Sequence, residues 1–397
     1  MKIMAVLFIL FALLTLKGGL ALAEGTTIDY SGSLEVDGIT QSLNSDFFLN
    51  GFLPGPSPLA SLPLFGSHFK WQNDIRIVPN DQTTLKLRVS YLSDTVQTIV
   101  SNNDQFSLSR AFIDFTPGEL FSIRAGKQRL AWGTGYAWNP SNILDQPRNA
   151  FADADDPEGV MAFRADLNFG KGATQVVITP GQSWDSSGRA VRLKASPGGV
   201  DLSLGVVQNG TQTPATIADF ACSLSGVGLH GEVRYQSAGN IRLDKNDIMD
   251  YLIGVDYNLP GGYYVAVEYY HNDQAYKSVA ELTAYLATIP HGTPEEMAAF
   301  YAYTMNYLNT LGNNGGVMQD HFFVRGMKKF GENATVELLL IYCPIDHSLV
   351  GQPKFEYVWG QNTSLFVKGL LASGDIGSEA NILPAKSNWT LGMKVNF

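Results

Sequence analysis

Apolar and polar residues alternate one by one over many short stretches of the chain. Residues 85–91 show the pattern, with Leu85, Leu87, Val89 and Tyr91 on one face and Lys86, Arg88 and Ser90 on the other. The stretches 191–195, 229–235 and 251–257 repeat it. A period of two residues predicts β-strands that have one apolar and one polar face.

The connections between these stretches alternate in length. Gly, Pro, Asn and Asp, the residues that tight turns require, mark short connections at 79–81, 116–119, 170–172, 197–199, 226–228, 259–262, 331–333 and 360–362. Longer links lie between them, near 42–68, 95–105, 133–158, 181–188, 210–216, 237–247, 273–319, 345–353 and 375–387. Short turns at one end and long loops at the other are typical of membrane-spanning barrels. The chain is therefore expected to be all-β, a transmembrane antiparallel up-and-down β-barrel of about 18 strands, with 16 left open.

One long link departs from the strand pattern. Within 273–319, residues 280–289 and 294–311 have helical patterning, and Thr293 is a suitable N-cap for the second helix. We expect a helical extracellular loop here. It either folds over the mouth of the barrel or only decorates its surface.

The first residues resemble a secretory signal peptide. Lys2 precedes an apolar run over 3–16, and Ala21-Leu22-Ala23 forms a small-x-small cleavage site. We expect residues 1–23 to be removed and residues 24–397 to form the barrel. No later apolar stretch approaches the length of a membrane-spanning helix, so export leads either to the periplasm or to the cell outer membrane.

The last residues repeat the alternation and end in an aromatic residue. Trp389, Leu391, Met393, Val395 and Phe397 share one face. A final strand that ends in Phe resembles the C-terminal signature of outer-membrane barrels, which implies that Phe397 is read by the barrel-assembly machinery.

The amino-acid composition narrows the classes of protein that the chain could belong to. Only 16% of residues are charged while 45% are hydrophobic, which suits strands that are apolar on one side. The formal net charge of -10 argues against a nucleic-acid partner. Cys222 and Cys343 are either small apolar strand residues or a disulfide formed after export. No covalent haem motif and no other cofactor or metal motif is recognisable, so none is expected.

The polar face of the predicted strands gives the candidate pore-lining residues. These are Lys86, Arg88, Arg124, Gln128, Arg164, Asp166, Arg192, Lys194, Glu232, Arg234, Asp256, Glu268, Lys368 and Lys394, with Asp201 and Glu356 of the same parity. The small basic excess favours anions, because rings of charge set pore selectivity. The alternative is that these charges pair across strands and are solvated by lumen water.

The segment from Arg124 to Asn142, RAGKQRLAWGTGYAWNPSN, followed by Gly159-Val160, resembles a group of bacterial outer-membrane porins. These porins are loosely similar to the alginate-export porins, which pass an anionic polysaccharide through a lumen rich in Arg and Lys. The resemblance implies the barrel fold and the outer membrane. It also implies that the side chains of Arg124 and Gln128 face the lumen. Lys127 and Arg129 then face away from the lumen, unless the strand bulges near Gly126.

Two features of this segment have more than one interpretation. Trp132, Tyr136 and Trp138 could stack on a sugar, belong to an interface belt, or pack as a loop inside the barrel. The acidic group of Asp153, Asp155, Asp156 and Glu158 could bind calcium, although a solvated acidic loop explains it as well.

These observations predict an outer-membrane channel for passive passage of small polar or anionic solutes or oligosaccharides. The alternative is a barrel sheath around a periplasmic partner, such as a multihaem cytochrome. Catalysis is not expected: Ser223, Ser225 and His230 could be imagined as a nucleophile–base group, but no motif of a hydrolase or nucleotide-binding site is present.

Overall fold

The structure is a computed structural model that describes residues 26–43, 64–94, 104–146, 150–151, 158–237, 247–287, 316–375, 378–382 and 385–397. The predicted signal peptide, the predicted helix over 294–311 and three members of the acidic group (Asp153, Asp155 and Asp156) lie outside the described residues. Within the part that is described, no helix is long and apolar enough to cross a membrane.

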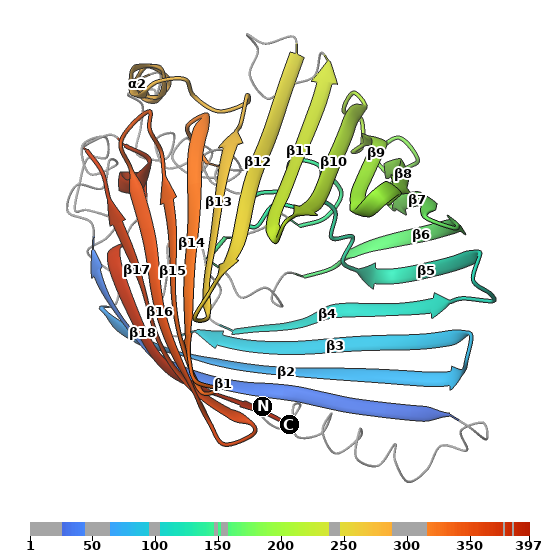
Figure 1. Cartoon of the computed structure of the whole chain (residues 1–397), viewed down its shortest axis with the longest axis horizontal. Coiled ribbons are helices and arrows are strands. Elements are labelled where there is room, and N and C mark those ends of the chain that lie inside the picture. Colours follow the sequence, from blue (N-terminus) through green and yellow to red (C-terminus); the bar gives the residue numbers. More distant parts are fainter. Residues whose placement is uncertain are drawn as a thin grey trace.

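The described chain forms one 18-stranded antiparallel sheet in which each strand pairs with its neighbour in sequence. The strands are β1 (Thr27–Leu43), β2 (Phe65–Asn80), β3 (Thr83–Asp94), β4 (Asp104–Phe115), β5 (Phe121–Gln128), β6 (Val160–Phe169), β7 (Gly172–Thr179), β8 (Gly188–Ala195), β9 (Val200–Gln208), β10 (Ala215–Leu224), β11 (Val227–Ser237), β12 (Asp247–Leu259), β13 (Tyr263–His271), β14 (Asp320–Phe330), β15 (Ala334–Tyr342), β16 (Leu349–Trp359), β17 (Thr363–Ser373) and β18 (Ala385–Asn396). Because β1 also pairs with β18, the sheet closes into a barrel (Figure 1). The predicted fold class and strand number are confirmed.

Short turns join the strands at one end, here called the short-turn end, and longer links join them at the other, the long-link end. The link predicted at 345–353 is shorter than expected, because β16 begins at Leu349. Pro353 lies inside β16, and neither Gln352 nor Pro353 pairs with β17. Proline lacks the N–H that a ladder needs, so the strand continues past it with pairing to β15 alone at this point.

Among the described residues, little helix accompanies the sheet. The short helices are η3 (Pro197–Gly199), α2 (Val279–Ala287) and η4 (Glu379–Ile382). Helix α2 coincides with the first of the two helices predicted in the 273–319 link, and it lies beyond the strands at the long-link end (Figure 1).

The predicted alternation separates the two faces of the wall. In β8, Val191 and Leu193 are 50% and 51% exposed on the outside, whereas Ala190 and Arg192 are buried on the inside. Side chains at paired positions of neighbouring strands share a face, and Gln175, Arg192 and Gly205 form such an inner row across β7, β8 and β9. The same alternation of inward-facing and outward-facing side chains continues around the barrel.

One irregularity differs from the prediction. The sequence left open whether the strand bulges near Gly126, and β5 pairs with β6 without a break from Phe121 to Gln128. The register shift lies instead in β4, where Arg110 pairs with Arg88 and Leu108 pairs with Val89, so that Ser109 is the extra residue. Lys127 therefore points outward, and Arg129 reaches the lumen because it lies beyond the end of β5.

The last residue closes the barrel. The Phe397 N–H donates to the Gly32 carbonyl at 3.0 Å, and the Gly32 N–H donates to the Phe397 carbonyl at 2.8 Å. The Phe397 ring lies over Gly32, where an added Cβ would stand 2.7 Å from ring carbons. Glycine at this position lets the Phe397 ring approach the backbone of β1 closely.

We predict that Gly32→Val lowers the yield of closed barrel. The valine side chain must displace either the Phe397 ring or the backbone of β2, and overpacking of this kind costs about 1–3 kcal/mol. The measurement is the fraction of refolded protein that migrates as a compact band on unheated SDS gels. Gly38→Val is the matched control on the same strand, since a Cβ there meets nothing within 4 Å. Equal yields from both variants would contradict the role of the Gly32–Phe397 contact.

Candidate functional site

The strand registers place the predicted lumen residues on the inner face. Across β4, β5 and β6, Asp114, Arg124 and Arg164 occupy paired positions, and Asp166, Gln175 and Arg192 do so across β6, β7 and β8. The remaining residues of the set share the inner parity of their strands: Lys86, Arg88, Gln128, Lys194, Glu232, Arg234, Asp256, Glu268, Lys368 and Lys394.

Several inner residues were missed by the sequence analysis. They include Lys70, Arg76, Arg110, Arg325 and Lys354 among the cations, and Glu35, Asp74, Asp219, Asp250 and Glu337 among the carboxylates. They were missed because the strands that carry them alternate less regularly between apolar and polar residues.

Many inner charges pair with one another. Arg192 lies 2.5 Å from Asp219, Arg164 lies 2.7 Å from Asp166, and Arg234 forms an ion pair with Asp250. The first and third of these pairs join different strands, as the alternative from the sequence expected, whereas Arg164 and Asp166 both lie on β6.

The link between β5 and β6 turns into the barrel. We call its described residues, 129–146 and 150–151, the inserted loop. Asp145 fixes its base, because one carboxylate oxygen accepts from the Leu130 and Ala131 N–H groups at 3.0 and 3.1 Å and from the Arg129 guanidinium at 2.8 Å. The Asp145 side chain is fully buried. The two ends of the loop are thus joined at one carboxylate.

Glu232 of β11 holds the middle of the inserted loop. One of its oxygens accepts from the N–H groups of Thr134 and Gly135 at 2.5 and 2.8 Å, and the other accepts from the N–H and hydroxyl of Ser141 at 3.2 and 2.6 Å. Gly133 makes this approach possible, since it has φ of 90° and its Cβ would lie 2.5 Å from the Glu232 carboxylate.

Glu268 of β13 holds the next turn of the loop. Its two oxygens accept from the N–H groups of Tyr136 and Ala137 at 2.5 and 2.9 Å, and one of them also lies 2.8 Å from His230 Nε2. The Tyr136 ring packs edge-on against His230, with the ring centroids 5.3 Å apart. Burial raises the pKa of the Tyr136 phenol above its ordinary value.

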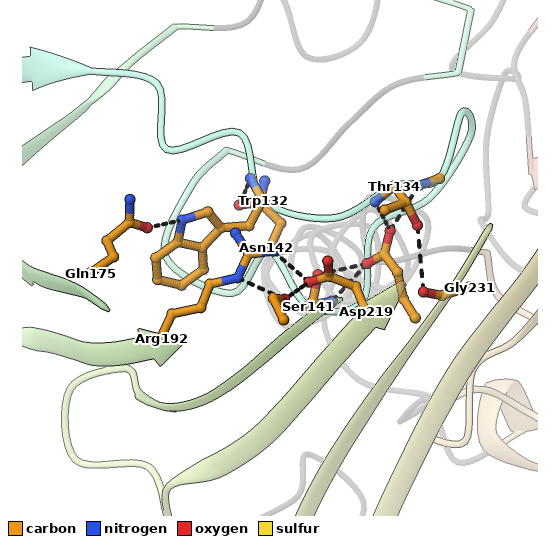
Figure 2. Close-up of polar contacts among 11 residues, drawn as sticks. Trp132, Thr134, Ser141, Asn142, Gln175, Arg192, Asp219 and Gly231 are labelled. Carbon is orange, nitrogen blue, oxygen red and sulfur yellow. Dashed lines mark hydrogen bonds and ion pairs between the residues drawn. The ribbon is translucent and has the colours of Figure 1, made fainter. Parts of the chain in front are cut away.

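Apolar contacts cover the rest of the inserted loop. Leu130, Trp132 and Leu144 pack on inward apolar residues of β6–β10, such as Val177 and Ile217. Figure 2 shows the Trp132 indole between wall residues: its N–H donates to Gln175 Oε1 at 2.7 Å, and the Arg192 guanidinium lies 5.5 Å from the ring centroid. The inner wall beneath the loop is therefore partly apolar, unlike a wall that faces water.

A second apolar group lies at the far end of the loop. Trp138 stacks on Tyr270 of β13 at 5.1 Å and contacts Phe323 of β14. Leu252 and Leu339 complete the cluster. Trp132 and Trp138 are 3% and 7% exposed. Of the three interpretations of the loop aromatics, the structure therefore supports the one in which the loop packs inside the barrel. The Trp132 and Trp138 rings offer no free face to a sugar.

The wall opposite the inserted loop contains two adjoining cavities of about 470 and 380 Å³. Ser31, Asp74 and Arg88 line both of them. Cations outnumber carboxylates in each lining. We call the inner face of β16–β18 and β1–β5 the basic wall; its cations are Lys70, Arg76, Lys86, Arg88, Arg110, Arg124, Lys354, Lys368 and Lys394, and Arg129 of the inserted loop also lines the smaller cavity.

Some cations of the basic wall are balanced and others are not. Arg88 pairs with Asp74 at 2.7 Å and Lys354 pairs with Glu356 at 3.1 Å. Lys86 and Lys368 lie over the rings of Phe112 and Phe366, and Lys394 lines the larger cavity. Within the described ranges, Lys86, Lys368 and Lys394 form no ion pair with a carboxylate. The basic wall thus carries net positive charge toward the lumen.

Connections at the long-link end are tied to one another. The Glu379 carboxylate of η4 accepts from the Val317 and Met318 N–H groups at 2.8 and 2.9 Å and lies 3.0 Å from His321 Nε2. The Glu379 N–H donates to Asp346 at 2.6 Å.

Burial raises the pKa of the nearby Cys343 thiol. Both cysteines are free, so the disulfide alternative is wrong.

The other chemical possibilities find no support in the contacts. His230 contacts Glu268, and no hydrogen bond joins it to Ser223 or Ser225. In the described part of the chain, no group of three or more His, Cys, Asp or Glu side chains could hold a metal ion. Glu158, the described member of the acidic group, pairs with Lys127 at 3.3 Å.

No protein-family model matches the chain, and no curated protein matches it. Among solved structures, the chain is similar to Pseudomonas aeruginosa OccK11 (OpdR), with a TM-score of 0.57 and 9% identity over 96% of this chain and 99% of that one. It is also aligned with a triple mutant of the Rhodopseudomonas blastica porin, with a TM-score of 0.47 and 11% identity over 94% and 100%.

The OccK11 comparison and the closed 18-stranded sheet agree on one fold. The chain has a porin-like fold, a closed antiparallel β-barrel. The porin resemblance read from residues 124–142 is confirmed at the level of the fold.

Proposed function

We propose that the protein is an outer-membrane channel for passive passage of small anionic solutes. The observation that carries the proposal is the division of the lumen. The inserted loop packs on the inner face of β6–β15, and the cavities lie along the basic wall. The open cross-section then runs between the loop and a wall of Lys and Arg, which attracts anions and disfavours cations.

The expected solutes are small. The larger cavity has a volume of about 470 Å³, within the range of sites that hold a single small molecule. Both the basic lining and the narrow space favour solutes with one or more carboxylate, sulfate or phosphate groups over long neutral oligosaccharides. In this proposal, residues 1–23 direct export and Phe397 serves recognition by the barrel-assembly machinery.

The test is single-channel recording of refolded protein in planar bilayers, with ion selectivity from the reversal potential in a salt gradient. We expect a steady open conductance and a reversal potential of the sign that marks anion preference. Silent bilayers from protein that is folded by its gel mobility would contradict the channel. They would turn attention to the sheath alternative, for which co-purification of a periplasmic haem protein is the readout.

A further inference from the structure

A histidine lies between two aspartates on the inner face of the basic wall. Asp37 of β1, His68 of β2 and Asp94 of β3 occupy paired positions of the three strands, so their side chains share a face. His68 Nδ1 lies 2.9 Å from Asp37 Oδ1, and His68 Nε2 lies 3.1 Å from Asp94 Oδ1. We call these three residues the histidine row. Each nitrogen of the ring is held against a carboxylate oxygen.

This arrangement makes the charge of the histidine row depend on one proton. A protonated imidazole ring has two N–H groups and donates to both aspartates, whereas a neutral ring has one N–H and leaves one aspartate facing a lone pair. With both aspartates ionised, the row carries one net negative charge in the first state and two in the second. Histidine is the side chain whose charge ordinarily changes near neutral pH.

Charged groups from four strands lie near the His68 ring. Besides the two aspartates, Lys368 of β17 interacts electrostatically with the ring and opposes a positive charge on it. Lys70 is the next inward residue of β2, and the β18 residue that pairs with Asp37 is a glycine. The His68 and Asp94 side chains are 26% and 16% exposed. Lumen water therefore reaches the ring, and the ring can exchange its proton with the solution.

The histidine row adjoins the larger cavity on the side of the long-link end. β1 runs from the short-turn end to the long-link end, and Glu35, the inward residue before Asp37, lines the larger cavity together with its paired residue Lys70. At about 3.3 Å per residue, the row lies about 7 Å further along β1 and β2 than these two residues. A solute that moves along these strands from the long-link end passes the row before it reaches them.

We propose that His68 sets the negative charge that anions meet before the larger cavity, so that anion passage through the barrel increases as the pH falls. The reason is electrostatic. When the ring is protonated, an approaching anion meets one net negative charge instead of two, and its repulsion from the row is weaker. The inference rests on the proposed channel and adds to it a residue that makes its selectivity depend on pH.

The test is the anion-to-cation permeability ratio of refolded protein in planar bilayers, taken from the reversal potential in a gradient of dilute salt. It is measured at about pH 5.5 and at about pH 9, which bracket the ordinary titration of histidine. We expect the ratio to be about threefold higher at the acidic pH, the effect of one charge about 7 Å away in water. Equal ratios at the two pH values overturn the inference.

The salt dependence separates charge from a change of conformation. At about 1 M salt the Debye length falls to about 3 Å, so the difference between the two pH values should largely disappear. A difference that keeps its size at high salt overturns the inference, because a charge on the histidine row would then be screened from the passing ion.

Three variants assign the effect to the ring. His68→Gln is neutral and His68→Lys is positively charged at both pH values, so the ratio should be independent of pH in each and higher in the lysine variant. Asp94→Asn keeps the ring but removes one of its carboxylate partners, so the midpoint of the pH dependence should move to lower pH. This third variant tests the inference even if the barrel does not tolerate a change at position 68. An unmoved midpoint in Asp94→Asn overturns the inference.

His271→Gln is the matched control for the histidine variants. His271 has the outer parity of β13, and its Nδ1 lies 2.7 Å from Asp320, so its charge does not face the lumen. We expect this variant to keep the wild-type response to pH. A wild-type response in His68→Gln protein that runs as a compact band on unheated SDS gels overturns the inference. Bilayers that stay silent at every pH overturn the proposed channel, and the inference with it.

Discussion

Replacing both Glu232 and Glu268 by glutamine is expected to raise the single-channel conductance by about twofold or more, because the inserted loop loses the wall contacts that fix its position. Both oxygens of each carboxylate accept hydrogen bonds, and together they engage the N–H groups of Thr134, Gly135, Tyr136, Ala137 and Ser141. A glutamine amide turns an NH₂ group toward some of these donors. Each charge-assisted bond that is lost costs about 1.5–3 kcal/mol.

The loop retains its apolar contacts in this double variant, so the expected change is a wider and noisier channel rather than an unfolded protein. Planar-bilayer recording measures both effects. Glu337→Gln is the matched control, because Glu337 is an inner-face carboxylate that pairs with Arg325 at 2.6 Å and has no contact with the inserted loop. Unchanged conductance in a double variant that folds normally would show that the loop does not set the width of the passage.

Neutralising the uncompensated lysines of the basic wall is expected to lower anion preference by about fivefold in the permeability ratio. The variant is Lys86→Gln, Lys368→Gln and Lys394→Gln combined. These ammonium groups have no ion pair in the described structure, so their removal leaves no carboxylate unpartnered and the barrel should fold with ordinary yield. The reversal potential in a salt gradient gives the ratio.

Lys328→Gln is the control for the lysine variant. Lys328 lies on the outer parity of β14, with its ammonium group 3.6 Å from the centroid of the Tyr263 ring. Neutralising it removes charge from the outer surface without altering the lumen, so the reversal potential should stay at the wild-type value. A combined variant that keeps the wild-type reversal potential would mean that ions do not pass along the basic wall.

The two sides of the lumen contribute differently to these predictions. The side under the inserted loop is fixed by buried carboxylates and by apolar packing around Trp132 and Trp138. The basic wall lines two cavities, and its residues Lys86, Lys368 and Lys394 have no carboxylate partner within the described ranges. Substitutions on the first side should therefore act on the width of the passage, and those on the second on its selectivity.

The sequence by itself determined the strands, their approximate number and their two faces. Alternation is a local property, since residues i and i+2 of a strand share a face whatever the rest of the chain does. Turn residues such as Gly331 and Gly360, both at positive φ, are local signals too. For this reason the parity of Lys86, Arg124 and Arg192 could be predicted, and so could the even number of strands.

Only the tertiary structure decided what the lumen contains. The bonds from Thr134 to Glu232 and from Tyr136 to Glu268 join residues 98 and 132 positions apart, and no local pattern specifies such a distance. One signal was present: the doublets Val176-Val177, Val206-Val207 and Phe322-Phe323 break the alternation where the inward residue packs in a cluster with the inserted loop. The loop enters the barrel because the N–H groups around Gly133 and Gly135 and the rings of Trp132 and Trp138 find carboxylates and apolar partners there, and that complementarity exists only once the sheet has closed.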